Sequence, residues 1–182
     1  MTATVFEMYK AQAAVLVPIF KALEKEMGSE KAQRFLSDAI GGAFREFGCQ
    51  AYAETEEGNE GHFGNQAFSI LQMFSEEGAL EYEIHEQSDD RLKFNITRCK
   101  YAELYKSIDA PELGFLFVCN QDYPFQDAMR DDLVMNRPQT IMEGFSHCKF
   151  NWHVAKDVEE AREKREREET DVRERQKKIQ KP

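Results

Sequence analysis

The chain has 182 residues, of which 41% are hydrophobic and 12% aromatic, a composition that suits one domain with a single core and excludes a disordered chain. Its formal net charge of −10 repels a phosphate backbone, so we expect no nucleic-acid partner.

We expect no targeting segment among the first residues of the sequence. Residues 1–10 lack a basic cluster, and the apolar run at residues 13–20 is short and contains Pro18. We therefore expect neither a signal peptide nor a membrane span. Without a sign of secretion we expect a cytoplasmic protein with reduced thiols. The cysteines are Cys49, Cys99, Cys119 and Cys148.

Two helices are predicted in the first 50 residues. Thr4 can cap a first helix with 3.6-residue periodicity, which Pro18 should kink and Gly28 should end. Ser29 can cap a second helix that closes at Gly48. The apolar stripe of this second helix consists of Ala32, Phe35, Leu36, Ala39, Ile40, Ala43, Phe44 and Phe47.

The middle of the chain changes its periodicity from 3.6 to two. Residues 54–64 are polar and glycine-rich, which indicates a loop, and residues 66–74 predict a short helix. Residues 80–84 and 92–96 then alternate between apolar and polar, with Ser88-Asp89-Asp90 between them as a turn. This pattern predicts an antiparallel hairpin.

The second half is predicted to hold two helical pieces and two more strands. The helical pieces span residues 101–107 and 112–121, with Pro111 at a first helical position, and the strands span residues 133–140 and 142–154. Helices and strands form separate runs. We therefore predict one α+β domain over residues 1–155, with a helical N-terminal half packed on an antiparallel sheet of about four strands.

Residues 156–182 are mostly charged, and Val158, Val172 and Ile179 are their only large apolar residues. Acid-before-base pairs at i,i+4 favour a solvated helix. We expect this C-terminal arm to extend from the domain with few core contacts. Alternatively, the heptad spacing of the apolar residues makes it a coiled-coil arm that joins protomers into a homo-oligomer.

Cys99 ends the second strand of the predicted hairpin. Strand alternation places Leu92, Phe94 and Ile96 on one face, so Cys99 should lie on the other face. The adjacent Arg98 would lower the pKa of its thiol if the strand ends there. The alternative is a small buried side chain without chemistry.

Cys119 and Asp122 are three residues apart, a spacing that places both on one helical face. The carboxylate could then take the thiol proton or bind a cationic amidine. Equally, Asp122 could lie on the surface and Cys119 in the core. Arg137 and Thr140 lie where a strand should end, and Cys148 lies on the apolar face of the last strand, where it could simply pack.

Standard motifs for metals and cofactors are missing from the sequence. The histidines show no HxxxH or HxH spacing, and there is no CxxC. A phosphate-binding loop and a dinucleotide fingerprint are also missing. We expect no cofactor and no metal, although Cys99, Cys119, Cys148 and His147 could converge in space.

Four segments in a fixed order resemble the L-2-amino-thiazoline-4-carboxylate hydrolase family over residues 90–153. They are Thr97-Arg98-Cys99-Lys100-Tyr101-Ala102, Cys119-Asn120-Gln121-Asp122, Arg137 with Thr140, and Gly144 followed by Cys148-Lys149-Phe150. The charged tail is not typical of that family. Pro138 and His147 are local differences that bear on the substrate.

The resemblance implies a hydrolase that opens a five-membered cyclic amidine to an N-carbamoyl-cysteine-like product. Its catalytic residues would be Cys99, Cys119, Asp122 and Cys148, with Cys99 or Cys119 as nucleophile and Asp122 as base and amidinium partner. Its substrate-binding residues would be Thr97, Arg98, Tyr101, Arg137 and Thr140, with Arg98 or Arg137 binding the substrate carboxylate.

Two non-enzymatic alternatives remain open at this point. A sensor would hold a small ligand or a metal in the same pocket and assemble through the C-terminal arm. A structural adaptor would leave the three family cysteines fully packed. Measured thiol reactivity separates these classes from an enzyme.

Overall fold

The computed structural model describes residues 3–56 and 61–179. Its centre is an antiparallel four-stranded sheet in the order β1-β2-β4-β3. The strands are β1 (Leu80–Ser88), β2 (Arg91–Cys99), β3 (Leu133–Asn136) and β4 (Cys148–Val154). Helices and strands occur in separate runs, which confirms the predicted α+β class and the predicted hairpin.

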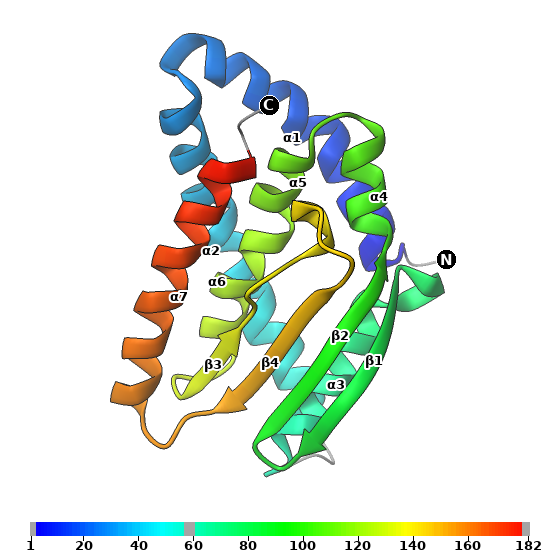
Figure 1. The fold of residues 1–182 in the computed structure, drawn as a ribbon, viewed down its shortest axis with the longest axis vertical. Helices are drawn as coiled ribbons and strands as arrows, with labels where there is room; N and C mark the ends of the chain where they lie inside the picture. Colours follow the sequence, from blue (N-terminus) through cyan, green and yellow to red (C-terminus); the bar gives the residue numbers. More distant parts are fainter. Residues whose placement is uncertain (1–2, 57–60, 180–182) are drawn as a thin grey trace.

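The N-terminal helices are α1 (Val5–Met27), α2 (Ser29–Glu56) and α3 (Phe63–Phe74). Of these, α2 and α3 lie behind the sheet, whereas α1 lies beyond its upper end against α2 (Figure 1). Leu92, Phe94 and Ile96 of β2 are buried on this side, and Phe94 stacks on Phe150 of β4 with 4.7 Å between ring centroids. The core therefore lies between the sheet and the helices, as the strand alternation predicts.

The starts of both long helices agree with the sequence, but the end of the second does not. Thr4 caps α1, which runs through Pro18 and ends at Gly28 with a φ of 84°. In contrast, α2 continues past Gly48 to Glu56. A Cβ at Gly48 would lie only 2.3 Å from the carbonyl oxygen of Phe125, so this glycine permits close helix packing rather than ending the helix. Residues 57–60 of the expected loop lie outside the described residues.

The second half of the chain is more broken than the periodicity predicts. It contains α4 (Lys100–Ser107), α5 (Pro111–Phe117), the 3-10 turn η2 (Cys119–Gln121), α6 (Asp122–Asp127) and the 3-10 turn η3 (Ile141–Glu143). The expected helix at residues 112–121 breaks at Val118, which has φ −114° and ψ −69°. The expected strand at residues 142–154 starts late, because Thr140 caps η3 by accepting a hydrogen bond from the Glu143 amide.

The C-terminal segment forms the helix α7 (Val158–Ile179), which lies along the β3 edge of the sheet (Figure 1). The expectation that it extends away from the domain is wrong, because Val172, Arg175 and Gln176 are buried. Arg165 also donates from its Nε to the carbonyl oxygen of Leu133 at 2.8 Å. The aliphatic part of a long arginine side chain can thus pack against the domain, although its charge suggests a solvated residue in the sequence.

Membrane insertion through a helix is not a feature of the part of the chain that the structure describes. Within residues 3–56 and 61–179, every helix is too short or too polar to cross a bilayer.

Candidate active site

Polar side chains from four separate segments come together where β2, η2, β3 and β4 approach one another. The charge of Asp122 raises the pKa of all three thiols, those of Cys99, Cys119 and Cys148. Cys148 in turn raises the pKa of Cys99 and of Cys119. Coulomb interactions weaken with distance, so these four groups lie near one another. We refer to Cys99, Cys119, Asp122, Arg137 and Cys148 as the polar cluster.

A β-bulge brings Cys99 to this cluster. Glu81 pairs with Arg98 and Tyr82 pairs with Ile96, so Thr97 is one extra residue in β2. The extra residue reverses the alternation and places Cys99 on the same side as Ile96, whose partner across the sheet is Cys148. The prediction that Cys99 lies on the face opposite Ile96 is therefore wrong.

The structure does not bring Thr97 and Arg98 to the polar cluster. The Arg98 guanidinium lies outside, where it donates to Glu103 at 2.7 Å and to Glu81 at 3.2 Å. The Thr97 hydroxyl donates to the carbonyl oxygen of Glu81. Arg98 is consequently not among the main causes of the pKa shift of the Cys99 thiol, and it does not face a common site with Asp122.

Asp122 and Arg137 form an ion pair at the centre of the cluster. Arg137 follows the end of β3, and its Nη1 donates to Asp122 Oδ2 at 2.7 Å. The Arg137 side chain is 1% exposed, whereas Asp122 keeps 32% of its side-chain surface accessible. Burial raises the pKa of Asp122 to about 6, although Arg137 opposes the shift. Asp122 is therefore an accessible carboxylate that is more basic than an ordinary aspartate.

The Arg137 guanidinium lowers the pKa of the Tyr123 phenol, so the two side chains lie close together, but two donor nitrogens of Arg137 form no hydrogen bond of normal geometry with the described residues. Nε and Nη2 have no hydrogen-bond partner in the part of the chain that the structure describes. These two nitrogens form one edge of the guanidinium, the fork that binds a carboxylate with two parallel hydrogen bonds. The rings of Phe115, Tyr123 and Phe150 surround the group at 5.2 to 5.9 Å. Both nitrogens are buried, so an anion reaches them only when a neighbouring side chain moves.

The three thiols of the cluster are protonated at neutral pH. Burial raises the pKa of Cys99 to about 12 and that of Cys148 to about 11. It also raises the pKa of Cys119 well above the usual value, although Arg137 opposes the shift. The prediction of a low-pKa thiolate is wrong, because desolvation outweighs the one nearby cation. Asp122 thus has the lowest pKa among these four acidic groups of the cluster.

Tyrosines line the cluster from the helical side. Tyr101 is buried and donates from its hydroxyl to the carbonyl oxygen of Phe74 at 3.0 Å. Tyr9 of α1 is buried beside Asp122, because the charge of that carboxylate adds to the effect of burial in raising the pKa of Tyr9. Tyr9 remains a phenol donor. Tyr9 is not recognisable as a site residue from the sequence, because it lies among the buried apolar residues of α1.

Thr140 is fully buried but already engaged. Its hydroxyl donates to Glu143 Oε2 at 2.8 Å and accepts from the Glu143 amide. Glu143 also receives two hydrogen bonds from Arg175 of α7. Glu143 and Arg175 were not predicted as site residues from the sequence. One pattern indicates Arg175, since it lies three residues after Val172 and four before Ile179, on the face that packs.

No metal site assembles from the described residues: between positions 3 and 56 and between 61 and 179, no three His, Cys, Asp or Glu side chains are placed to bind one ion. His147 instead lies within hydrogen-bonding distance of Gln139 and Ser146. His147 therefore does not form a metal site with the three cysteines, a possibility that the sequence left open.

A family model described as L-2-amino-thiazoline-4-carboxylic acid hydrolase matches residues 8–152. No curated protein matches the chain. The matched region contains the whole polar cluster and ends before α7 begins.

Proposed function

The chain belongs to the L-2-amino-thiazoline-4-carboxylic acid hydrolase family, and on this premise we propose that it hydrolyses a small cyclic amidine that carries a carboxylate. The observation that carries the proposal is the Asp122–Arg137 pair. It combines an accessible carboxylate of raised pKa with a buried cation that has two unused donors. A ring with one amidinium and one carboxylate is complementary to both groups.

Each half of the pair has a separate role in this proposal. Asp122 Oδ2 accepts from Arg137, and the other carboxylate oxygen faces the amidinium of the substrate. The free edge of Arg137 receives the substrate carboxylate after a side-chain movement. The ring atom to be attacked, the carbon between nitrogen and sulfur, then lies next to Asp122.

Water, rather than a thiolate, is the nucleophile that the protonation states favour. Asp122 takes a proton from water while the water oxygen bonds to the ring carbon, and the bond from that carbon to sulfur then breaks. The departing sulfur takes the proton from Asp122 and leaves as a thiol, while the remaining hydroxyl proton of the former water passes to solvent as the carbonyl forms. The net change is the addition of one water to give an N-carbamoyl-cysteine-like product. The protonated cysteines of the cluster line the site as weak hydrogen-bond donors.

A ring-opening assay with 2-amino-2-thiazoline-4-carboxylate, with the product followed by NMR, tests the proposal. Asp122→Asn should lower kcat by about 100-fold or more, the usual contribution of a general base. Cys99→Ser, Cys119→Ser and Cys148→Ser should keep most of the activity, because no thiolate takes part. If one cysteine variant bound the substrate but did not turn it over, the thiol of that cysteine, and not water, would be the nucleophile. Binding without turnover by the wild type would favour the sensor hypothesis.

A further inference from the structure

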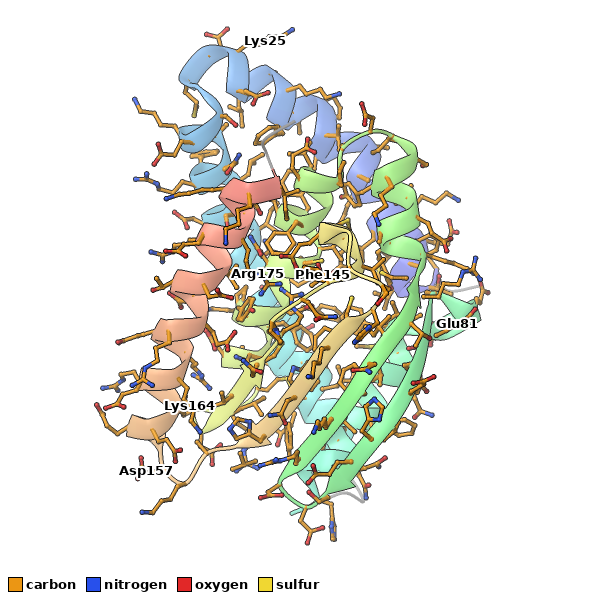
Figure 2. All side chains as sticks on the ribbon, in the orientation of Figure 1. Lys25, Glu81, Phe145, Asp157, Lys164 and Arg175 are labelled. Atoms are coloured by element: carbon orange, nitrogen blue, oxygen red, sulfur yellow. The ribbon has the colours of Figure 1, made fainter. Side chains whose placement is uncertain are left out.

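Arg175 is the most deeply buried cation of α7 (Figure 2). Its side chain is 8% exposed, and that of its partner Glu143 is 7% exposed. Arg175 donates from Nε and Nη2 to the two carboxylate oxygens of Glu143, at 2.8 and 2.5 Å. This two-pronged geometry fixes the orientation of the guanidinium as well as its position.

The remaining donor of Arg175 reaches the polar cluster. Its Nη1 donates to the backbone carbonyl oxygen of Arg137 at 2.6 Å. The side chain of the same Arg137 holds Asp122. One guanidinium from α7 therefore connects Glu143 of η3 to the backbone of the residue that pairs with the proposed base.

Nearby contacts place the two arginines on a common support. The Arg137 guanidinium lies 5.9 Å from the centroid of the Phe115 ring, and that of Arg175 lies 5.5 Å from the same centroid. Thr140 donates to Glu143 Oε2, which also accepts from Arg175. The segment from Arg137 to Glu143 is thus held at both ends by α7.

Arg175, which makes these contacts from α7, lies outside the region that the family model covers. The match ends at residue 152, and α7 begins at Val158. The burial of Arg175 and Glu143 would be costly if either lost the other, because an unpaired buried charge is strongly disfavoured. A helix that served only as a solvated tail has no need of such a pair.

We propose that Arg175 is a positioning residue, through which α7 sets the geometry of the Arg137–Asp122 pair and thereby the proton affinity of Asp122. Arg175 does not touch the substrate. It fixes the Arg137 backbone, so that the Arg137 side chain meets Asp122 at hydrogen-bonding distance. The catalytic part of this inference rests on the function proposed above, whereas its structural part does not.

Arg175→Lys tests the inference while keeping a cation beside Glu143. A single ammonium cannot bond both Glu143 oxygens and the Arg137 carbonyl with the same geometry, so Arg137 shifts away from Asp122. The matched control is Arg173→Lys on the same helix, since Arg173 is exposed and contacts only Glu169 among the ion pairs of the described residues. Circular dichroism and thermal melting establish that both variants fold.

The deciding readout is the titration of Asp122, followed by the ¹³C shift of its carboxyl carbon without any substrate. In Arg175→Lys the pKa of Asp122 should rise by roughly one unit, the size of effect that an opposite charge has at contact distance. It should not change in Arg173→Lys. With the ring-opening substrate, kcat should fall about 10-fold or more, because small displacements of catalytic groups are costly. KM should rise as well, because Arg137 also binds the substrate carboxylate in the proposed function.

An unchanged Asp122 titration in folded Arg175→Lys would overturn the inference and leave Arg175 as a helix clamp. If Arg175→Lys does not fold, Glu143→Gln with Arg175 intact gives the same test, because Arg175 then loses its orienting partner. A titration that shifts in an enzyme without ring-opening activity would support the positioning role and reject the proposed function, so the two failures are distinguishable.

Discussion

Two arginine–carboxylate pairs in this protein have the same 2.7 Å contact but differ in their exposure to solvent. Arg98 and Glu103 lie on the surface where β2 leads into α4, with side chains 48% and 52% exposed. Arg137 and Asp122 lie inside, with side chains 1% and 32% exposed. Water screens the outer pair, whereas desolvation of the inner pair raises the pKa of Asp122 to about 6.

Burial, and not contact distance, therefore accounts for the different chemical properties of the two ion pairs. The outer arginine satisfies its donors with two glutamates on the surface. The inner arginine retains two unused donors beside a basic carboxylate. Only the inner pair therefore has the capacity to recognise an anion and to move a proton.

Removing the charge of each arginine should give the largest contrast. Arg137→Met keeps an apolar stem among the aromatic rings and leaves Asp122 without its cation, so the free energy of unfolding should fall by about 2–4 kcal/mol. Arg98→Met should cost at most about 1 kcal/mol, as for an exposed pair. Urea denaturation of both variants measures the contrast, and equal losses would contradict it.

The loss of stability in the Arg137→Met variant should depend on pH, in a direction that the pKa of Asp122 determines. Without Arg137 the pKa of Asp122 rises further above its value in the unfolded chain, so the folded state binds a proton more strongly. The loss of stability should therefore be smaller at about pH 5, where Asp122 is protonated, than at about pH 8. A loss that does not depend on pH would mean that Asp122 does not sense the arginine.

The packing beneath the inner pair offers a second contrast, between two glycines of α2. Gly48→Ala would place a Cβ 2.3 Å from the Phe125 carbonyl oxygen of α6, the helix that starts at Asp122. We expect it to destabilise the protein by about 1–3 kcal/mol through overpacking. Gly42→Ala meets no atom within 4 Å and should stabilise by about 0.5–1 kcal/mol. Thermal melting that gives both changes the same sign would contradict this account.

Thiol labelling compares an exposed cysteine with the buried cysteines of the polar cluster. Cys49 is exposed, whereas Cys119 and Cys148 are buried and Cys99 is partly buried with a pKa of about 12. With iodoacetamide at about pH 8, Cys49 should react at least about 10-fold faster than the other three, because the thiolate is the reactive form. Mass spectrometry of the labelled peptides measures each rate. Fast labelling of Cys99 would show that its thiol is ionised after all.

Sequence periodicity predicted much of the fold, because the hairpin and the N-terminal helices follow local patterns. The end of α2 was not predictable, because the reason for Gly48 lies in a distant segment, the backbone of Phe125. The packing of α7 was also hidden. Its buried face combines Val172 with Arg175, and a charged residue is ordinarily taken as solvated.

The candidate site was predictable only in part, for a similar reason. The spacing of Cys119 and Asp122 indicated a shared location, and the pKa effects between them agree with it. The bulge at Thr97, which turns Cys99 inward and leaves Arg98 outside, depends on the register with β1. Sequence alternation alone cannot reveal such a register shift.

In the proposed function Asp122 acts as the general base, and burial raises the pKa of its carboxyl group. The most direct measurement is the pH dependence of kcat/KM for ring opening of 2-amino-2-thiazoline-4-carboxylate. Because the reaction requires the carboxylate form, kcat/KM should rise with pH and level off above a midpoint near the Asp122 pKa of about 6. A profile with no transition near that pH, or the same transition in Asp122→Asn, would contradict the account.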